Sequence, residues 1–147
     1  MRLLVQRVKE ANVEVNNNII GEIENGFLVF IGITHEDTEK EAEYLSNKLC
    51  NLRIFEDEQG KMNLSIKDVK GKLLIVSQFT LYANCEKGNR PSFSDAGNPG
   101  MANELYEYFC KKCEEKGIEI RKGIFGEDMK VGLINDGPVT IMLEKSF

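Results

Sequence analysis

Residues 71–82 of the chain, GKLLIVSQFTLY, form the segment around which we expect the fold to be built. The four residues at 73–76 are apolar without a break, which is typical of a strand buried on both faces of a sheet. The strand then ends in Ser77, Gln78 and, two residues on, Thr80. Hydroxyl, amide and backbone N–H groups held on a rigid edge suit the stabilisation of a reacting carbonyl group. The alternative is a core strand whose polar side chains only satisfy neighbouring backbone groups.

A second segment, residues 135–140 with the sequence NDGPVT, lies between expected strands at 129–134 and 139–143. Proline cannot donate a hydrogen bond to a strand ladder, so Gly137-Pro138 indicates a tight connection between the two strands. The pattern does not predict the isomer of this bond, because only about 5–6% of X–Pro bonds are cis. Without further information, a plain hairpin turn is the preferred interpretation of this segment.

The remaining pattern predicts a single domain, residues 1–147, of class α+β. The order is rich in strands, with helices inserted rather than strictly alternating, which favours packed sheets. Each expected helix starts at a good cap and carries apolar residues at spacings of three and four. We expect about eight strands, at residues 2–15, 19–23, 27–33, 53–55, 73–76, 118–124, 129–134 and 139–143, and helices between 37 and 52 and between 98 and 117.

Composition limits the classes of function. The chain is 41% hydrophobic and 29% charged, and no apolar run approaches the roughly 20 residues of a membrane span. Charged and apolar residues alternate from the first residues onward, unlike a signal peptide, so we expect a cytosolic enzyme or binding protein. The net charge of −5 argues against an extended interface with double-stranded nucleic acid, which needs many Lys and Arg contacts to phosphate. A nucleic-acid partner is therefore expected to be contacted over a small part, such as a single-stranded end.

Metal or cofactor chemistry is not expected. Cys110 and Cys113 have the spacing of a zinc ligand pair, but the chain has no second such pair and its single histidine is His35. These cysteines lie in a helical pattern, where cysteine is a common small core residue. The acidic run at 56–58 is expected to be a solvated turn rather than a carboxylate cluster. We predict no metal, no cofactor and reduced thiols.

Five segments carry a resemblance to a known family: MRLLVQRV at 1–8, RIFEDEQGKMNLS at 53–65, SQFTL at 77–81, GNRPSF at 88–93 and NDGPVT at 135–140. In this order, over the whole chain, they resemble the D-aminoacyl-tRNA deacylases. The resemblance implies two packed, mostly antiparallel β-sheets with two main helices outside, in a cytoplasmic homodimer that needs no cofactor and no membrane. It implies as substrate a D-amino acid esterified to the 3′ end of a tRNA, which a deacylase hydrolyses as a step of translation quality control.

The resemblance also assigns roles to the second segment. In the family a cis Gly–Pro pair enters the active site of the partner subunit and excludes the side chain of an L-aminoacyl group. Gly137 and Pro138 match that pair. Arg7 is implied to hold the Gly–Pro loop through hydrogen bonds to carbonyl groups, and the alternative is a solvated arginine on an edge strand. Thr140 belongs to the same predicted set for substrate binding and chiral selection.

Two mechanisms of ester hydrolysis fit the first segment. In one, Thr80 is the nucleophile or orients the attacking water, but it has no histidine to activate it, since we expect His35 to lie elsewhere. In the other, backbone N–H groups near Phe79 and Thr80 hold the oxyanion while the ribose 2′-hydroxyl of the substrate assists. Ser77 and Gln78 would then line and order the pocket. We favour the second mechanism, because the chain offers no obvious general base.

Several further residues have both a functional and a structural interpretation. Phe79 would stack on the terminal adenine or pack in the core, and Phe93 and Met129 are candidate pocket walls or core residues. Lys87 and Arg90, in the loop at 83–98, would bind RNA phosphates or form a solvated pair.

Two other functions compete with ester hydrolysis of D-aminoacyl-tRNA. A non-catalytic module that binds an RNA 3′ end would use the same pocket. A general esterase would need a Ser–His pair or a GxSxG motif, and the chain has neither. The chain departs from the family in the turn FGED at 125–128 and at Cys85, both outside the two motifs.

Overall fold

The computed structural model describes all residues from Met1 to Phe147. It contains eight strands, two α-helices and one short 3₁₀ helix, which confirms the expected mixture of strands with two main helices. The elements are β1 (Arg2–Val15), β2 (Asn18–Ile23), β3 (Gly26–Gly32), α1 (Glu39–Asn51), β4 (Phe55–Glu56), β5 (Met62–Leu64), β6 (Lys72–Ser77), η1 (Phe79–Tyr82), α2 (Pro99–Glu115), β7 (Ile120–Lys122) and β8 (Lys130–Glu144).

Strand β6 is the central buried strand that its apolar run predicts. The main sheet has the order β2-β1-β3-β6-β7, and β8 pairs with β1 along the other edge of that strand. β6 is parallel to both β3 and β7, while β1 is antiparallel to β2, β3 and β8. Leu73 and Ile75 belong to the large core cluster, and Leu74 and Val76 to a smaller cluster on the opposite face. Both faces of β6 are therefore buried.

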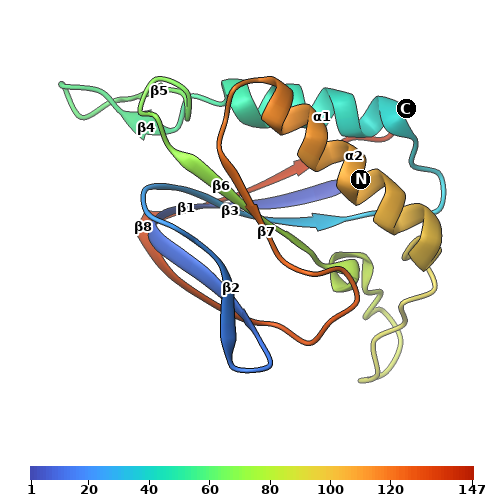
Figure 1. The fold of residues 1–147 in the computed structure, drawn as a ribbon. Helices are drawn as coiled ribbons and strands as arrows, with labels where there is room; N and C mark the ends of the chain where they lie inside the picture. Colours follow the sequence, from blue (N-terminus) through green and yellow to red (C-terminus); the bar gives the residue numbers. More distant parts are fainter.

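The two helices cover one face of this sheet and enclose the large core cluster (Figure 1). α1 begins at Thr38, whose side chain and backbone exchange hydrogen bonds with Glu41 and Lys40 in a capping box. α2 begins at Asn98, whose carboxamide oxygen accepts hydrogen bonds from the first backbone N–H groups, and Pro99 occupies the first helical position. The sequence offers Asp37 or Thr38 as the cap of the first helix and Asn98 followed by Pro99 as the start of the second, and the structure uses Thr38 and Asn98.

Our prediction of two packed, mostly antiparallel β-sheets is correct in part: the main sheet is mixed, and the second sheet is small. One continuous six-stranded sheet bends so that β2 comes into contact with β6 and β7, on the face opposite the helices (Figure 1). Shifts of register between Gln6 and Val8 and between Val8 and Glu10 interrupt the pairing of β1 with β8. Bulges of this kind bend and twist a strand pair, so the two long strands pass from one layer to the other. A separate sheet contains only β4 and β5.

One local prediction also differs from the structure. β8 is one strand from Lys130 to Glu144, so Gly137-Pro138 is not a turn between two strands but part of a bulge within one. The polar residues after β6 lead into η1. Neither helix has the length and apolar character needed to cross a membrane.

Candidate active site

A pocket of about 780 Å³ opens at the carboxyl ends of the parallel strands β3 and β6. Ile31 and Val76 form its floor, and Ser77, Gln78 and Phe79 line it where β6 passes into η1. Segments 93–99 and 125–131 supply the remaining walls. This volume is typical of small-molecule sites, and the carboxyl ends of parallel strands are where such sites commonly form.

The 3₁₀ helix η1 is held firmly against the sheet. The N–H of Gln78 donates to the carbonyl of Ile31 at 2.8 Å, which extends the ladder of β3 by one residue. Gly32 permits a close approach, since a Cβ atom there would lie 2.8 Å from the Cβ of Leu81. At the other end of η1, Arg2 Nη1 donates to the carbonyl of Leu81 at 2.7 Å. The first N–H groups of η1, which no helical carbonyl can satisfy, are thereby fixed in position at the pocket.

The predicted catalytic residues come together at this point, with one exception. Ser77, Gln78 and Phe79 line the pocket, whereas Thr80 is exposed and is not part of its lining. Gln78 Nε2 donates a hydrogen bond to Thr80 Oγ1, so the two side chains are paired with each other. No acid or base group is hydrogen-bonded to the Thr80 hydroxyl that would activate it.

His35 lies in the pocket wall, contrary to our expectation that it lies elsewhere. Its Nε2 is 2.7 Å from the carbonyl oxygen of Ser94, so this nitrogen carries a proton and donates. No hydrogen bond joins His35 to Ser77 or Thr80. In this geometry the imidazole ties a wall segment in place, and it does not activate a hydroxyl group.

Aromatic and apolar side chains form the mouth of the pocket. The rings of Phe79 and Phe93 meet edge to face with centroids 5.1 Å apart, and both side chains are exposed. Met129 and Phe125 also line the pocket, and Met129 packs against the smaller core cluster as well. The sequence left Phe93 and Met129 open between pocket wall and core, and the structure places both in the pocket wall. Exposed rings in this position can receive a base.

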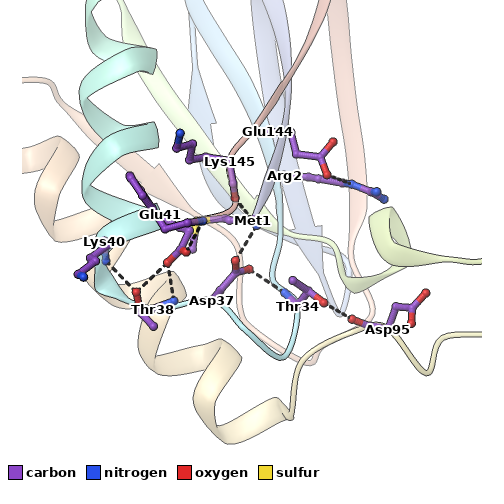
Figure 2. Close-up of polar contacts among 11 residues, drawn as sticks. Met1, Arg2, Thr34, Asp37, Thr38, Lys40, Glu41, Asp95, Glu144 and Lys145 are labelled. Carbon is purple, nitrogen blue, oxygen red and sulfur yellow. Dashed lines mark hydrogen bonds and ion pairs between the residues drawn. The ribbon is translucent and has the colours of Figure 1, made fainter.

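A network of polar contacts anchors the pocket wall to the first strand (Figure 2). The Met1 amine donates to the Asp37 carboxylate at 2.7 Å, and the same carboxylate accepts the Thr34 N–H at 2.8 Å. The Thr34 hydroxyl in turn donates to the carbonyl of Asp95 at 2.5 Å. The loop that follows β3 and the wall segment at 93–99 are therefore held as one unit.

The second group of predicted residues surrounds the bulge at Asp136–Pro138. The peptide bond between Gly137 and Pro138 is cis. Arg7 is 5% exposed, and its Nε donates to the carbonyl of Asp136 at 2.8 Å while its Nη1 donates to the carbonyl of Ile54 at 2.7 Å. The interpretation of Arg7 as a solvated residue is therefore wrong, because the side chain is buried and pins the bulge.

Asn135 closes the bulge from the other side, a role that the sequence analysis did not assign to it. Its Oδ1 accepts the N–H of Val139 at 2.7 Å, and its Nδ2 donates to the carbonyl of Val139 and to Thr140 Oγ1 at 3.1 and 3.0 Å. Gly137 has φ +148°, and a Cβ atom there would lie 2.7 Å from Val139. The signal that marks Asn135 is the ability of its short amide to bond nearby backbone groups.

The pocket and the bulge lie at the levels of opposite ends of strand β3. Ser77 pairs with Ile31 on β3, whereas Arg7 pairs with Phe27, four residues away along the same strand. At 3.3 Å per residue, the two levels are about 13 Å apart. No residue of the segment 135–140 lines the pocket. The structure therefore brings the predicted site residues into two groups and does not unite them within one chain.

The buried cysteines belong to the core and not to the site. Cys50, Cys110 and Cys113 all lie in the cluster under the helices. Burial raises the pKa of the Cys110 thiol to about 12, so this thiol stays protonated at neutral pH. No group of three histidine, cysteine or acidic side chains is placed to hold a metal ion.

Comparison with known proteins places this chain in a class of hydrolases. The family model described as D-Tyr-tRNA(Tyr) deacylase matches residues 4–144. A D-aminoacyl-tRNA deacylase of Thermosipho melanesiensis is 57% identical over 98% of this chain and 97% of its own length. The corresponding protein of Fusobacterium nucleatum subsp. nucleatum is 59% identical over 98% and 95%.

Solved structures agree on the fold. A structure titled c-Myc DNA Unwinding Element Binding Protein superposes with a TM-score of 0.93 at 42% identity over the whole of both chains. A probable eukaryotic D-amino acid tRNA deacylase superposes with a TM-score of 0.83 at 18% identity over 97% of each chain. The chain belongs to the D-Tyr-tRNA(Tyr) deacylase family. It is accordingly an enzyme, a hydrolase that acts on aminoacyl-tRNA in translation proofreading.

Proposed function

We propose that this protein hydrolyses the ester bond between a D-amino acid and the 3′-terminal adenosine of tRNA. The products are the free D-amino acid and the tRNA, and the reaction takes place in the cytoplasm, where its substrate is found. We further propose that L-aminoacyl esters are rejected by Gly137 and Pro138 of a partner subunit. The observation that carries this proposal is the separation of a pinned, rigid bulge from the pocket of its own chain.

The chemistry follows from the groups at the start of η1. Attack of water on the ester carbonyl produces a tetrahedral oxyanion, which the fixed backbone N–H groups of Phe79 and Thr80 stabilise. The 2′-hydroxyl of the terminal ribose assists, because the chain supplies no general base there. Ser77 and Gln78 line the pocket and order the substrate. The pairing of Thr80 with Gln78 supports this mechanism over a threonine nucleophile.

Chiral selection follows from the shape of the bulge. Its tip consists of a glycine and a proline, so the groups it presents are backbone atoms and a compact ring. Arg7 and Asn135 hold that tip from two sides, so it cannot move away from a ligand at low cost. Inserted beside the α-carbon of the aminoacyl group, it leaves room for hydrogen on the L side and for no larger group. This is selection by steric exclusion of the wrong enantiomer.

The sheet edge supports assembly into a homodimer. β8 pairs with β1 on one side only, so its other edge is free for a second chain. Leu133, Ile134 and Met142 of β8 are exposed. A long, apolar, unpaired edge is a liability unless something covers it. A two-fold dimer would cover this edge and would exchange the two bulges reciprocally between the two pockets.

Side-by-side hydrolysis of D- and L-tyrosyl-tRNA by the purified protein tests the reaction. Loss of the D-ester alone is the expected result. Loss of both esters would contradict the chiral filter, and loss of neither would favour a module that binds RNA 3′ ends without hydrolysis. Sedimentation of the same sample measures the oligomeric state, and a monomer that discriminates fully between the esters would contradict action across subunits.

Mixed dimers test whether the bulge acts on the partner. Ser77→Tyr fills the pocket of one subunit, and Gly137→Val distorts the bulge of the other. Each variant alone should lose selective hydrolysis of the D-ester. If the bulge acts across the interface, the mixed dimer keeps one intact pocket facing one intact bulge, so selective hydrolysis should return at up to half the wild-type rate. If the bulge acts within its own chain, the mixed dimer contains no complete site and stays inactive.

A further inference from the structure

The loop that follows η1 is an ordered arm that projects away from the rest of the chain (Figure 1). Asn84 and Ser92 exchange backbone hydrogen bonds of 2.8 and 2.9 Å and form an isolated antiparallel bridge. The turn between them contains Gly88 at φ +66°, a conformation that favours glycine. Every residue from 84 to 93 is exposed, so the arm contributes little to the core. Exposed loops that a rigid scaffold holds in position often carry binding residues, so this hairpin is a candidate for a binding function.

The base of the arm is part of the pocket wall. Phe93 lines the pocket against Phe79, and the next two residues are tied to the loop after β3. The carbonyl of Ser94 accepts a hydrogen bond from His35, and that of Asp95 accepts one from Thr34. These bonds lie near the Asp37 network of Figure 2. The tip of the arm is therefore held at a fixed place relative to a ligand in the pocket.

The arm carries two cations that take part in no ion pair. Lys87 and Arg90 are the only basic residues in the segment 83–98, and Glu86 is the only acid between residues 84 and 93, so the hairpin keeps an excess of positive charge. None of the ion pairs of the structure includes Lys87 or Arg90. By contrast, Lys130 near the pocket wall is paired with Asp128 at 2.7 Å. Arg90 is three residues from Phe93, so at most about 10 Å of extended chain separates the guanidinium-bearing residue from the pocket.

We propose that this arm, through Lys87 and Arg90, binds the phosphodiester backbone of the substrate RNA next to its terminal adenosine. This inference rests on the proposed function, because it assumes that the terminal nucleoside occupies the pocket. The protein carries a net charge of −5, so attraction to a polyanion must come from local cations. An arginine fork and a lysine ammonium on a presented arm suit phosphate groups, and they carry no preference for a base.

The double variant Lys87→Gln/Arg90→Gln tests this inference through salt dependence. Each phosphate contact to a single strand contributes about 0.7 to the slope of log affinity against log salt concentration. Loss of two contacts should therefore reduce the slope measured for KM of D-tyrosyl-tRNA by about 1.4. KM at low salt should rise, while kcat should stay near that of the wild type. The matched control is Lys48→Gln/Lys111→Gln, which removes the same charge from exposed positions on α1 and α2 that form no ion pair; Lys48 only lies over the ring of Tyr44.

A second substrate separates the arm from the pocket. D-Tyrosyl-adenosine has the same ester and the same nucleoside without any phosphate. The rise in KM of the arm variant should therefore be seen with D-tyrosyl-tRNA and not with D-tyrosyl-adenosine. The inference would be overturned if the salt dependence of KM were unchanged in the arm variant. It would also be overturned if KM for D-tyrosyl-adenosine rose by the same factor, or if the arm variant changed its oligomeric state. If the wild-type protein hydrolyses neither ester, the proposed function fails. The arm is then tested by the salt dependence with which uncharged tRNA binds to the wild type and the variant.

Discussion

Arg7 is the residue whose replacement tests most directly how the bulge is held. Its guanidinium donates to the carbonyl groups of Asp136 and Ile54 at 2.8 and 2.7 Å. Its distances to the carboxylates of Asp136 and Glu56 are longer, 3.9 and 4.0 Å, and both of these acids are more than a third exposed. The ion pairs therefore add little, and the two hydrogen bonds to carbonyl groups decide the energetics.

The expected magnitude follows from those two bonds. A hydrogen bond with one charged partner contributes about 1.5–3 kcal/mol, and the lower end applies because the Asp136 carbonyl is only partly buried. Arg7→Met should therefore lower the free energy of unfolding by about 3 kcal/mol, a large share of the stability of an ordinary domain. Arg7→Lys retains a single donor group that can reach one carbonyl at a time, so it should lose about half as much.

Urea unfolding at one fixed protein concentration measures this change, because the apparent stability of the proposed dimer would depend on concentration. The control is Arg53→Met, at an exposed residue without a hydrogen-bond partner, which should change stability by at most about 0.5 kcal/mol. In the same preparations, hydrolysis of L-tyrosyl-tRNA should rise relative to the D-ester as the bulge loosens. If Arg7→Met matches Arg53→Met in both stability and stereoselectivity, the reasoning about the pinned bulge is wrong.

Three further predictions test other parts of the molecule. Thr80→Ala should retain hydrolysis of D-tyrosyl-tRNA within about 3-fold of wild type, since we assign the oxyanion to backbone N–H groups; a loss of 100-fold or more would restore the threonine nucleophile. Burial opposes ionisation of Glu41, but hydrogen bonds from Thr38 and Phe147 outweigh it and lower the pKa of this carboxyl to about 2. Stability from Glu41 should therefore be complete above about pH 4.5 and should be lost as the pH falls towards 2, and Glu41→Gln should flatten that part of the urea-unfolding profile. Tyr106→Phe removes a buried hydrogen bond of 2.8 Å to the carbonyl of Ile75, so it should cost about 1 kcal/mol in the same assay and leave hydrolysis unaffected.

Much of the fold follows from local patterns in the sequence. The apolar run at 73–76 predicts a strand buried on both faces, and the structure buries it between two core clusters. The starts of both helices are visible in Thr38 and in Asn98-Pro99, because capping depends on a few neighbouring residues. Phe93 and Met129 line the pocket, which is one of the two interpretations that the sequence left open. These features depend on residues close together in the chain, which a sequence displays directly.

The family was also predicted from the sequence, since the resemblance rests on short segments in a fixed order. The roles of individual site residues were predicted only in part. Arg7 was left open between a solvated residue and a clamp, because its partners are the carbonyls of Ile54 and Asp136, far away in the chain. The position of His35 was missed for the same reason, since its partner Ser94 is also distant in the chain. Asn135 was missed for another reason: its partners Val139 and Thr140 are close in the chain, but its bonds to them depend on the path of the bulge.

The tertiary structure alone decided how the parts are joined. The continuous sheet, the parallel pairing of β3, β6 and β7, and the single long strand β8 all depend on hydrogen bonds between distant segments. Local patterns show which residues are buried, but they do not show which strand lies beside which. The same pairing places Ser77 and Arg7, which holds the bulge, at the levels of opposite ends of β3. The sequence by itself determined the elements and the chemical groups of this protein. Only the register between distant strands determined that the predicted site residues form two separate groups, because that register depends on hydrogen bonds between segments far apart in the chain.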